Sequence, residues 1–574
     1  MKEFIKSIGI VITMLYFGLT AFASDFELNG INYTISSLTD LTVVVDGADD
    51  KESQSLEIPE TVEYKGKTLT VVSIENQAFK GFTKLSEILL PSSLSSIGDE
   101  AFQSDSCLNN VRLPENLEYL GKSVFRGCKA LKEIIIPNII TDIPDYAFGD
   151  CSGLVNVILH EGIKSIGEGA FYSTSIERIN LPDSLKNLGI EAFCKTKIKS
   201  ITIPKNIETI PSGCFETCSE LESVIFEKET KLTSIESFAF YNCITLASIE
   251  LPESLKTIYS AAFRGCASLK EFFIPSLVNK IAVSIIWDCP NISKLSIGED
   301  LDSLPFEYDD DNNSYIAYYR TLGSYCSVKY RGYSGEVGVR TSETYLENLK
   351  ELIIRDSPNT LSLKGFYIDD RTWPAFGNLD LDYFYVGRPL TNIQQWSVQY
   401  KYGNKNFKIS YPQGTGNIKT LEISGFCTEN PYIYQKIDTL ILGKNITNVI
   451  PENLYKDNLK SITCFSTLPP TITEMNAFPT HVYTDATLYV PYGCKEVYSE
   501  ALGWKNFWNI VEMDPSAGVD SINYGNESME SDEVDVYSVD GCLIEHKTEF
   551  SKIKDLPKGL YIIVSEKGSR KINI

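Results

Sequence analysis

The chain has 574 residues, 43% of them apolar, so it is too long for one compact core and too apolar for a disordered chain. Its formal charge of −24 repels phosphate backbones and anionic membranes, so we expect no nucleic-acid partner. Beyond the N-terminus no run of about 18 apolar residues occurs, so we expect no transmembrane segment in the mature chain.

The N-terminus has the pattern of a secretory signal peptide. Two lysines precede an apolar run from Ile8 to Leu19, and Ala21-Phe22-Ala23 gives a small-x-small cleavage pattern. The run is too short to span a membrane comfortably. We therefore predict that residues 1–23 are a signal peptide and that the mature chain is secreted.

Residues 24–70 are predicted to form an N-terminal β cap. The segment from Phe26 to Tyr33 reads as a hairpin, because Asn29-Gly30 suits a tight primed turn. Together with the segment from Tyr64 to Thr68 it would cover the open end of a sheet, which otherwise invites aggregation.

The chain then repeats itself. Phenylalanine recurs in steps of 22 to 25 residues at positions 79, 102, 125, 148, 171, 193, 215, 240 and 263, and prolines recur in phase with it. A unit this short cannot bury its own apolar face, so the units must stack on one another. The repeat pattern therefore predicts a solenoid.

One unit, residues 131–151, shows the role of each part. Alternate residues of the first segment, Leu131, Ile134 and Ile136, are predicted to face the core from a short strand that ends at a proline without an N–H group. A second wall begins at Ile143. The next residues suit a short helical turn that places Phe148 in the core, where we expect it to be buried and stacked on Phe171 of the next rung.

These motifs identify a resemblance to the BspA-like leucine-rich repeat. The matching stretches include Ile97-Gly-Asp-Glu-Ala-Phe102, Ile166-Gly-Glu-Gly-Ala-Phe171 and Ala262-Phe263-Arg-Gly-Cys266-Ala-Ser-Leu269. The resemblance implies regular leucine-rich repeats over residues 71–298, with parallel strands and short helical turns. It also implies a secreted or surface protein that binds host extracellular-matrix proteins or other cells.

The period breaks after residue 298. Residues 299–340 look like a tyrosine-rich insertion, in which the run Asp309–Asn313 suits a solvated loop better than a calcium site. Residues 341–513 are predicted to be a degenerate repeat array with a closing segment. Its strand motifs begin at Leu349, Leu381, Ile418, Ile437 and Leu459.

The last residues differ again. Residues 514–533 are polar and acidic, as in a linker, and residues 534–574 alternate apolar strands with Asp-Gly and Pro-Lys-Gly turns, which predicts a small all-β module. Leu556-Pro-Lys-Gly-Leu-Tyr561 resembles the sorting domain of type IX secretion cargo, although Cys542 stands where such domains usually carry Arg or Lys. This resemblance implies the surface of a Gram-negative bacterium.

Cysteine and histidine are the residue types most suited to nucleophilic or metal chemistry in this chain. Six cysteines lie three residues after the repeat phenylalanine position, which favours small buried core residues but leaves pairing between rungs open. They are Cys128, Cys151, Cys218, Cys243, Cys266 and Cys289. The chain has only three histidines and no convergent acid–base set, so we expect neither catalytic residues nor an enzyme, and no metal or cofactor.

The outward side of the first strands is the candidate binding surface. Five of nine residues that should face solvent there are apolar, either because branched residues suit any strand or because they form a protein-binding stripe. The five are Leu89, Ile135, Ile158, Ile225 and Phe273. The rival hypothesis is a carbohydrate-binding surface protein that uses the tyrosines of the insertion as a sugar platform.

Overall fold

The computed structural model describes residues 24–301, 348–362, 381–391, 417–431 and 433–513, and the backbone of further strands between residues 307 and 344, 397 and 410, and 533 and 573. The predicted signal peptide and nearly all of the predicted linker lie outside the described residues. The chain divides into two compact units, residues 1–196 and 197–574, and each is described by itself.

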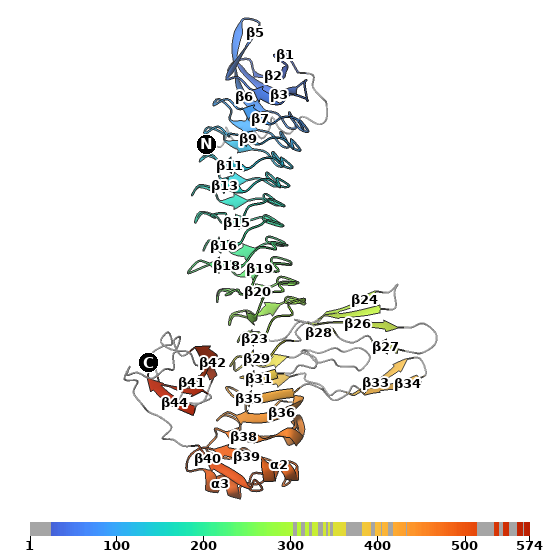
Figure 1. Ribbon diagram of the computed structural model, residues 1–574, viewed down its shortest axis with the longest axis vertical. Helices are drawn as coiled ribbons and strands as arrows, with labels where there is room; N and C mark the ends of the chain where they lie inside the picture. The colour runs from blue at the N-terminus through green and yellow to red at the C-terminus, as the bar shows by residue number, and fades with distance from the viewer. Residues whose placement is uncertain are drawn as a thin grey trace. The chain divides into compact units, whose positions relative to one another are not determined.

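Two walls of short parallel strands build the repeats of the first unit (Figure 1). They have the 23-residue register expected from the sequence, so that Ile134 pairs with Val157 and Ile143 with Ile166. The first wall contains β4 (Ser55–Glu57), β7 (Glu87–Leu89), β9 (Asn110–Val111), β11 (Glu133–Ile135) and β13 (Asn156–Ile158). The second contains β8 (Ser96–Ile97), β10 (Tyr119–Leu120), β12 (Asp142–Ile143), β14 (Ser165–Ile166) and β15 (Asn187–Leu188).

A third wall consists of turns, and here the expected short helical turn was wrong. Tyr146 and Asp150, two residues on either side of Phe148, have φ of 53° and 60°, and the corresponding residues of the other regular rungs also have positive φ. A left-handed residue ends any right-handed helical turn. It lets the N–H groups of Tyr146, Phe148 and Asp150 donate to the carbonyls of the next rung, at 2.7, 2.9 and 2.7 Å.

The core is a column of phenylalanine rings, as predicted. Phe148 and Phe171 are fully buried, and their ring centroids lie 5.7 Å apart with planes only 7° from parallel. The column runs from Phe79 to Phe193 in the first unit and through Phe215, Phe240 and Phe263 in the second. The residues expected to face inward, Leu131, Ile134 and Ile136, are also buried.

The N-terminal cap has the predicted hairpin. Asn29 and Gly30 both have positive φ, as a primed turn requires, and the Phe26 ring stacks on Tyr64 at 4.1 Å. The cap joins the second wall, since β3 pairs with β6 and β6 with β8. Its strands are β1 (Phe26–Leu28), β2 (Ile31–Ser37), β3 (Thr42–Ala48), β5 (Thr61–Tyr64) and β6 (Lys67–Ile74).

The second unit begins with further regular rungs. Its first-wall strands are β16 (Ser200–Ile203), β18 (Ser223–Phe226), β21 (Glu271–Phe273) and β23 (Lys294–Ile297). Its second-wall strands are β17 (Thr209–Ile210), β19 (Ser234–Ile235), β20 (Thr257–Ile258) and β22 (Lys280–Ile281).

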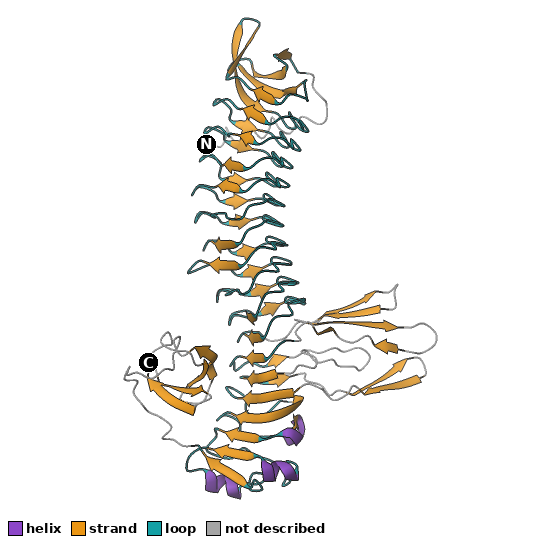
Figure 2. Cartoon of the chain, viewed as in Figure 1, coloured by secondary structure: helices purple, strands orange, loops and turns teal. Residues whose placement is uncertain are grey.

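The irregular strand motifs beyond residue 340 continue the parallel sheet that begins with β21 and β23. They form β29 (Glu351–Ile354), β31 (Leu381–Val386), β35 (Asn417–Ile423), β36 (Ile433–Leu442), β38 (Ser461–Cys464), β39 (Thr487–Val490) and β40 (Asn509–Glu512), with β37 (Leu454–Tyr455) beside β36. β30 (Leu361–Ser362) and β32 (Leu390–Thr391) pair in a second wall. Among the described residues, helices occur at this end, in η1 (Pro451–Asn453), η2 (Lys456–Asn458), α2 (Thr480–Asp485) and α3 (Lys495–Glu500) (Figure 2).

Two further regions are antiparallel. The predicted insertion contains β24 (Glu307–Asp311), β25 (Ile316–Arg320), β26 (Ser324–Tyr330) and β27 (Val337–Val339), and β28 (Glu343–Thr344), just beyond its predicted end, pairs with β26. A separate hairpin joins β33 (Ser397–Tyr402) to β34 (Lys405–Ser410). Within the run Asp309–Asn313, the first three residues lie in β24. The C-terminal module is a four-stranded sheet of β41 (Glu533–Ser538), β42 (Leu543–Glu549), β43 (Leu560–Ser565) and β44 (Gly568–Asn573). The domain boundaries given above stay predictions.

Candidate binding surface

The candidate surface is the strand face, by which we mean the outward side of the first-wall strands. Residues of these strands alternate between core and solvent, because successive side chains of a strand point to opposite faces. In β11, Ile134 is buried whereas Ile135 is 53% exposed. The strand phase predicted from the sequence is therefore correct.

Ile135 and Ile158 form one apolar patch on the strand face. They are paired residues of the neighbouring parallel strands β11 and β13, and Ile158 is 44% exposed. Beside them, the side chain of Asn156 hydrogen bonds that of Glu133. Ile135 and Ile158 thus present two branched apolar side chains to solvent. Next to them, Glu133 and Asn156 satisfy each other's hydrogen-bonding groups.

The other three candidates do not join this patch into a continuous stripe. Leu89 is exposed on β7, but Arg112 occupies the corresponding outward position of the next rung. Ile225 is exposed in the second unit and pairs with Thr202. Phe273 is only half-buried, and the Nζ atom of Lys294 lies 5.7 Å from its ring centroid.

The outward side of β31 and β35 in the second unit is buried. Tyr383 and Glu422 lie on β31 and β35, where the repeat phase would place them toward solvent, yet both are buried. The Tyr383 hydroxyl donates a hydrogen bond of 2.8 Å to Glu422 Oε2. No sequence signal distinguished these strands from open ones. The predicted sugar platform, the tyrosine side chains of the insertion, lies outside the described residues.

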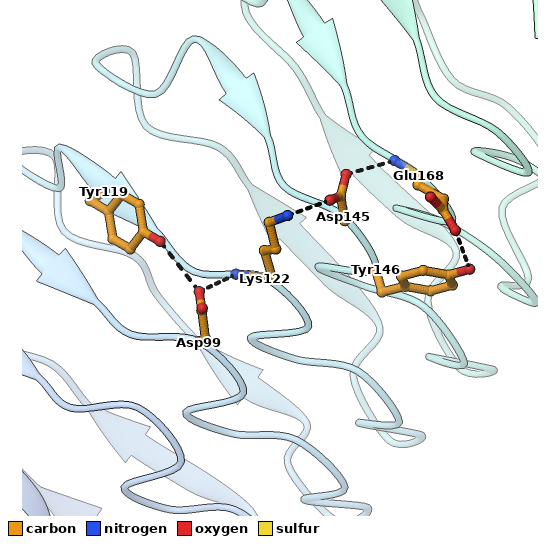
Figure 3. Close-up of polar contacts among 6 residues, drawn as sticks. All are labelled: Asp99, Tyr119, Lys122, Asp145, Tyr146 and Glu168. Atoms are coloured by element: carbon orange, nitrogen blue, oxygen red, sulfur yellow. Dashed lines mark hydrogen bonds and ion pairs between the residues drawn. The ribbon is translucent and has the colours of Figure 1, made fainter. Parts of the chain in front are cut away.

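A polar ladder follows the ends of the second-wall strands in the first unit (Figure 3). Asp99 Oδ1 accepts a hydrogen bond of 2.8 Å from the backbone N–H of Lys122 in the next rung, and Asp145 Oδ1 accepts one of 3.0 Å from Glu168 N–H. Lys122 Nζ lies 2.8 Å from Asp145 Oδ2. These carboxylates join successive rungs, so their role is structural.

Lys122 and Asp145 in this ladder each favour the charged form of the other. The hydrogen bond from Lys122 holds the pKa of Asp145 below its usual range, and the same bond raises the pKa of Lys122. At the end of the ladder, the Tyr146 hydroxyl donates to Glu168 Oε1 at 3.0 Å. Desolvation, with a contribution from that hydrogen bond, raises the pKa of Tyr146 to about 12. The tyrosine is therefore not poised for proton transfer near neutral pH.

The cysteine column consists of free thiols in the described residues. The six cysteines of this column are buried, and most contact the preceding rung: Cys151 Sγ, for example, lies 3.0 Å from the carbonyl oxygen of Phe125 and donates its S–H to it. Burial raises the pKa of the Cys151 and Cys289 thiols to about 12. Such thiols are poor nucleophiles, which agrees with the core role favoured by the sequence.

Two of the three histidines can be placed. The ring nitrogens of His160 contact the carbonyl oxygen of Ile140 and the N–H of Gly162, both at 2.9 Å, so this side chain joins its own loop to the preceding rung. His481 Nε2 lies 2.7 Å from the carbonyl oxygen of Asp457. The described residues contain no cluster of three or more His, Cys, Asp or Glu side chains suited to a metal ion. They also contain no helix long and apolar enough to cross a membrane.

The fold and its comparisons define the class of protein. Stacked parallel strands with a buried leucine, isoleucine and phenylalanine core make a leucine-rich-repeat solenoid. Residues 72–198 and 186–308 match the sequence model described as the BspA type leucine rich repeat region (6 copies). The match covers the regular repeats, residues 72–308.

Three solved structures are similar to the chain. A leucine-rich cell surface protein from Faecalibacterium prausnitzii is 20% identical and aligns over 49% of this chain and 90% of its own, with a TM-score of 0.34. A leucine-rich repeat protein from Bacteroides ovatus is 27% identical over 49% and 90%, with a TM-score of 0.32. The pneumococcal vaccine antigen PcpA is 20% identical over 65% and 95%, with a TM-score of 0.38. No curated protein matches the chain in sequence.

Proposed function

We propose that the chain is a secreted or cell-surface binding protein of the adhesin type, not an enzyme. Its partners would be proteins of the host extracellular matrix or of other cell surfaces. Leucine-rich repeats of this kind generally serve protein interaction. The observation that carries the proposal is the patch of Ile135 and Ile158, which leaves two apolar side chains about half exposed on a rigid sheet.

Exposed apolar residues on a sheet suit protein binding for a physical reason. A partner that covers them gains the free energy of apolar burial, about 25 cal/mol per Å², and the rigid strands lose little conformational entropy. Binding energy at such interfaces concentrates in a few central residues, each worth about 2 kcal/mol or more on truncation. Ile135 and Ile158 are the two adjacent exposed apolar residues of the strand face in the first unit.

The double variant Ile135→Asp, Ile158→Asp tests this function. We expect it to lose binding to a panel of immobilised matrix proteins, because two carboxylates would have to be desolvated at the interface. Its melting temperature should hardly change, since the two side chains contribute little to the core. Binding is measured by surface plasmon resonance and stability by calorimetry.

A matched control is the double variant Ile139→Asp, Ile190→Asp. These residues are 47% and 48% exposed in the same unit but lie outside the first-wall strands, so binding should persist. Equal binding by both double variants would contradict the strand-face proposal. Retention on a glycan array with none on matrix proteins would favour the carbohydrate alternative.

The C-terminal module has its own proposed role. Its four antiparallel strands pair only with one another among the described residues, as a detachable sorting module requires. We propose that it directs the chain to the surface of a Gram-negative bacterium. Its resemblance to type IX sorting domains supports this proposal.

A further inference from the structure

One position in the cysteine column holds a carboxyl group. Asp105 lies three residues after Phe102, as Cys128 lies three after Phe125. It is fully buried. Its Oδ1 atom accepts a hydrogen bond of 2.8 Å from the N–H of Phe82. Oδ2 is also buried, and no donor among the described residues reaches it.

Among the described residues, no cation forms an ion pair with Asp105. The preceding rung carries Lys80, whose Nζ pairs with Glu100, and Lys84, which is exposed. In the adjoining loop, Lys51 Nζ lies 5.7 Å from the Phe82 ring centroid. None of the ion pairs among the described residues includes Asp105.

The next rung offers no counter-charge either. Arg126 pairs with Asp150 at 3.1 Å, Lys129 is exposed, and Cys128 carries a thiol whose pKa is raised well above its usual range by burial. In the rung of Asp105 itself, Cys107 is exposed. An isolated carboxylate in such surroundings would lose its hydration without compensation, which favours the protonated form.

The cysteine column shows where the proton of Asp105 would point. Cys128 Sγ lies 3.1 Å from the carbonyl oxygen of Phe102, and Cys151 Sγ lies 3.0 Å from that of Phe125. Each thiol thus donates to the phenylalanine of the preceding rung. By the same register, we expect the carbonyl of Phe79 to be the acceptor for a proton on Asp105. A neutral carboxyl group can replace the thiol as a donor, whereas a carboxylate cannot.

We propose that Asp105 is a proton-dependent lock on the N-terminal rungs: its neutral carboxyl group takes the place of a thiol in the column, and its ionisation destabilises this end of the repeat array. Burial raises the pKa of Asp105 to about 8, although hydrogen bonds from the N–H groups of Phe82 and Gly81 lower it. Asp105 is therefore expected to ionise, and to destabilise this end of the repeat array, on the alkaline side of neutral pH.

The sign of the pH dependence follows from this raised pKa. Between the ordinary value of 3.8 and about 8, the unfolded state has lost the proton and the folded state keeps it. The folding equilibrium constant therefore falls about tenfold for each pH unit in this window. Below the window both states are protonated, and above it both are ionised, so the dependence levels off at each end.

The experiment compares melting temperatures of the mature chain and its Asp105→Asn and Asp105→Cys variants from about pH 4 to about pH 9. We expect the variants to melt close to the unsubstituted chain at the acidic end and progressively above it as the pH rises, with a plateau above about pH 8. The control Asp50→Asn changes an exposed carboxyl and should show no such divergence. Differences that are constant across the pH range would overturn the proposal.

A second measurement does not depend on the variants folding. Infrared spectroscopy of the unsubstituted chain should show the carbonyl stretch of a protonated carboxyl group at about pH 6, and the band should disappear as the pH passes about 8. Lack of the band at about pH 6 would mean that Asp105 is already ionised, and would overturn the proposal.

Discussion

Replacing Phe148 with alanine is expected to lower the free energy of unfolding by about 3–5 kcal/mol, the usual cost of a large-to-small change in a packed core. The Phe148 ring is fully buried and lies between two others, with centroids 5.8 Å from Phe125 and 5.7 Å from Phe171. The backbone on both sides is held by hydrogen bonds to the next rung, so the wall cannot collapse into the cavity. Chemical denaturation of the mature chain measures the effect.

Phe238→Ala is the matched control, because Phe238 is 40% exposed and lies two residues before a column position. Its loss should cost far less. Equal costs for the two variants would show that Phe148 is not held in a rigid column.

Deleting residues 533–574 is expected to abolish surface display and leave the truncated chain in the periplasm. The strands β41 to β44 pair with one another and with no other strand that the structure describes, so the melting of the repeats should be unchanged. Protease shaving of intact cells, followed by immunoblotting, measures display.

The reciprocal control attaches residues 514–574 to an unrelated exported protein, which should then reach the surface. If the truncated chain is displayed in normal amount, the module has another role. The Cys542 departure from the sorting pattern makes this test more informative than the resemblance itself.

Much of the repeat architecture could be predicted because every rung buries side chains at the same positions of its sequence. The spacing of Phe148 and Phe171, and the alternation of Ile134 with Ile135, encode which side chains are buried, and the structure agrees. Parallel register follows, since equal units stack in phase. The same alternation located the patch of Ile135 and Ile158.

The turn wall could be predicted only in part. The residues two positions after the phenylalanine of each rung include Gly127, Asp150 and Gly265, which tolerate positive φ. Those two before it include Tyr146 and Phe238, which have no such preference. There the backbone conformation is imposed by hydrogen bonds between rungs, a tertiary effect that local propensity does not contain. A helical turn was therefore expected where left-handed residues occur.

The burial of the outward side of β31 and β35 could not be predicted from the sequence either. Tyr383 and Glu422 occupy outward positions in the repeat phase, and only the folded structure shows that they are buried. The Asp105 lock has a sequence signal, a carboxylate in the column of Cys128 and Cys151, but its lack of a counter-charge depends on where neighbouring side chains point.

The most direct test of strand-face binding is a hydrogen–deuterium exchange footprint of the mature chain with the matrix protein that it retains most strongly. Binding across β11 and β13 should slow exchange in peptides that contain residues 133–136 and 156–159, with little change in the turn wall of the same rungs. Protection confined to the insertion, residues 299–340, or to the turn wall would contradict the account.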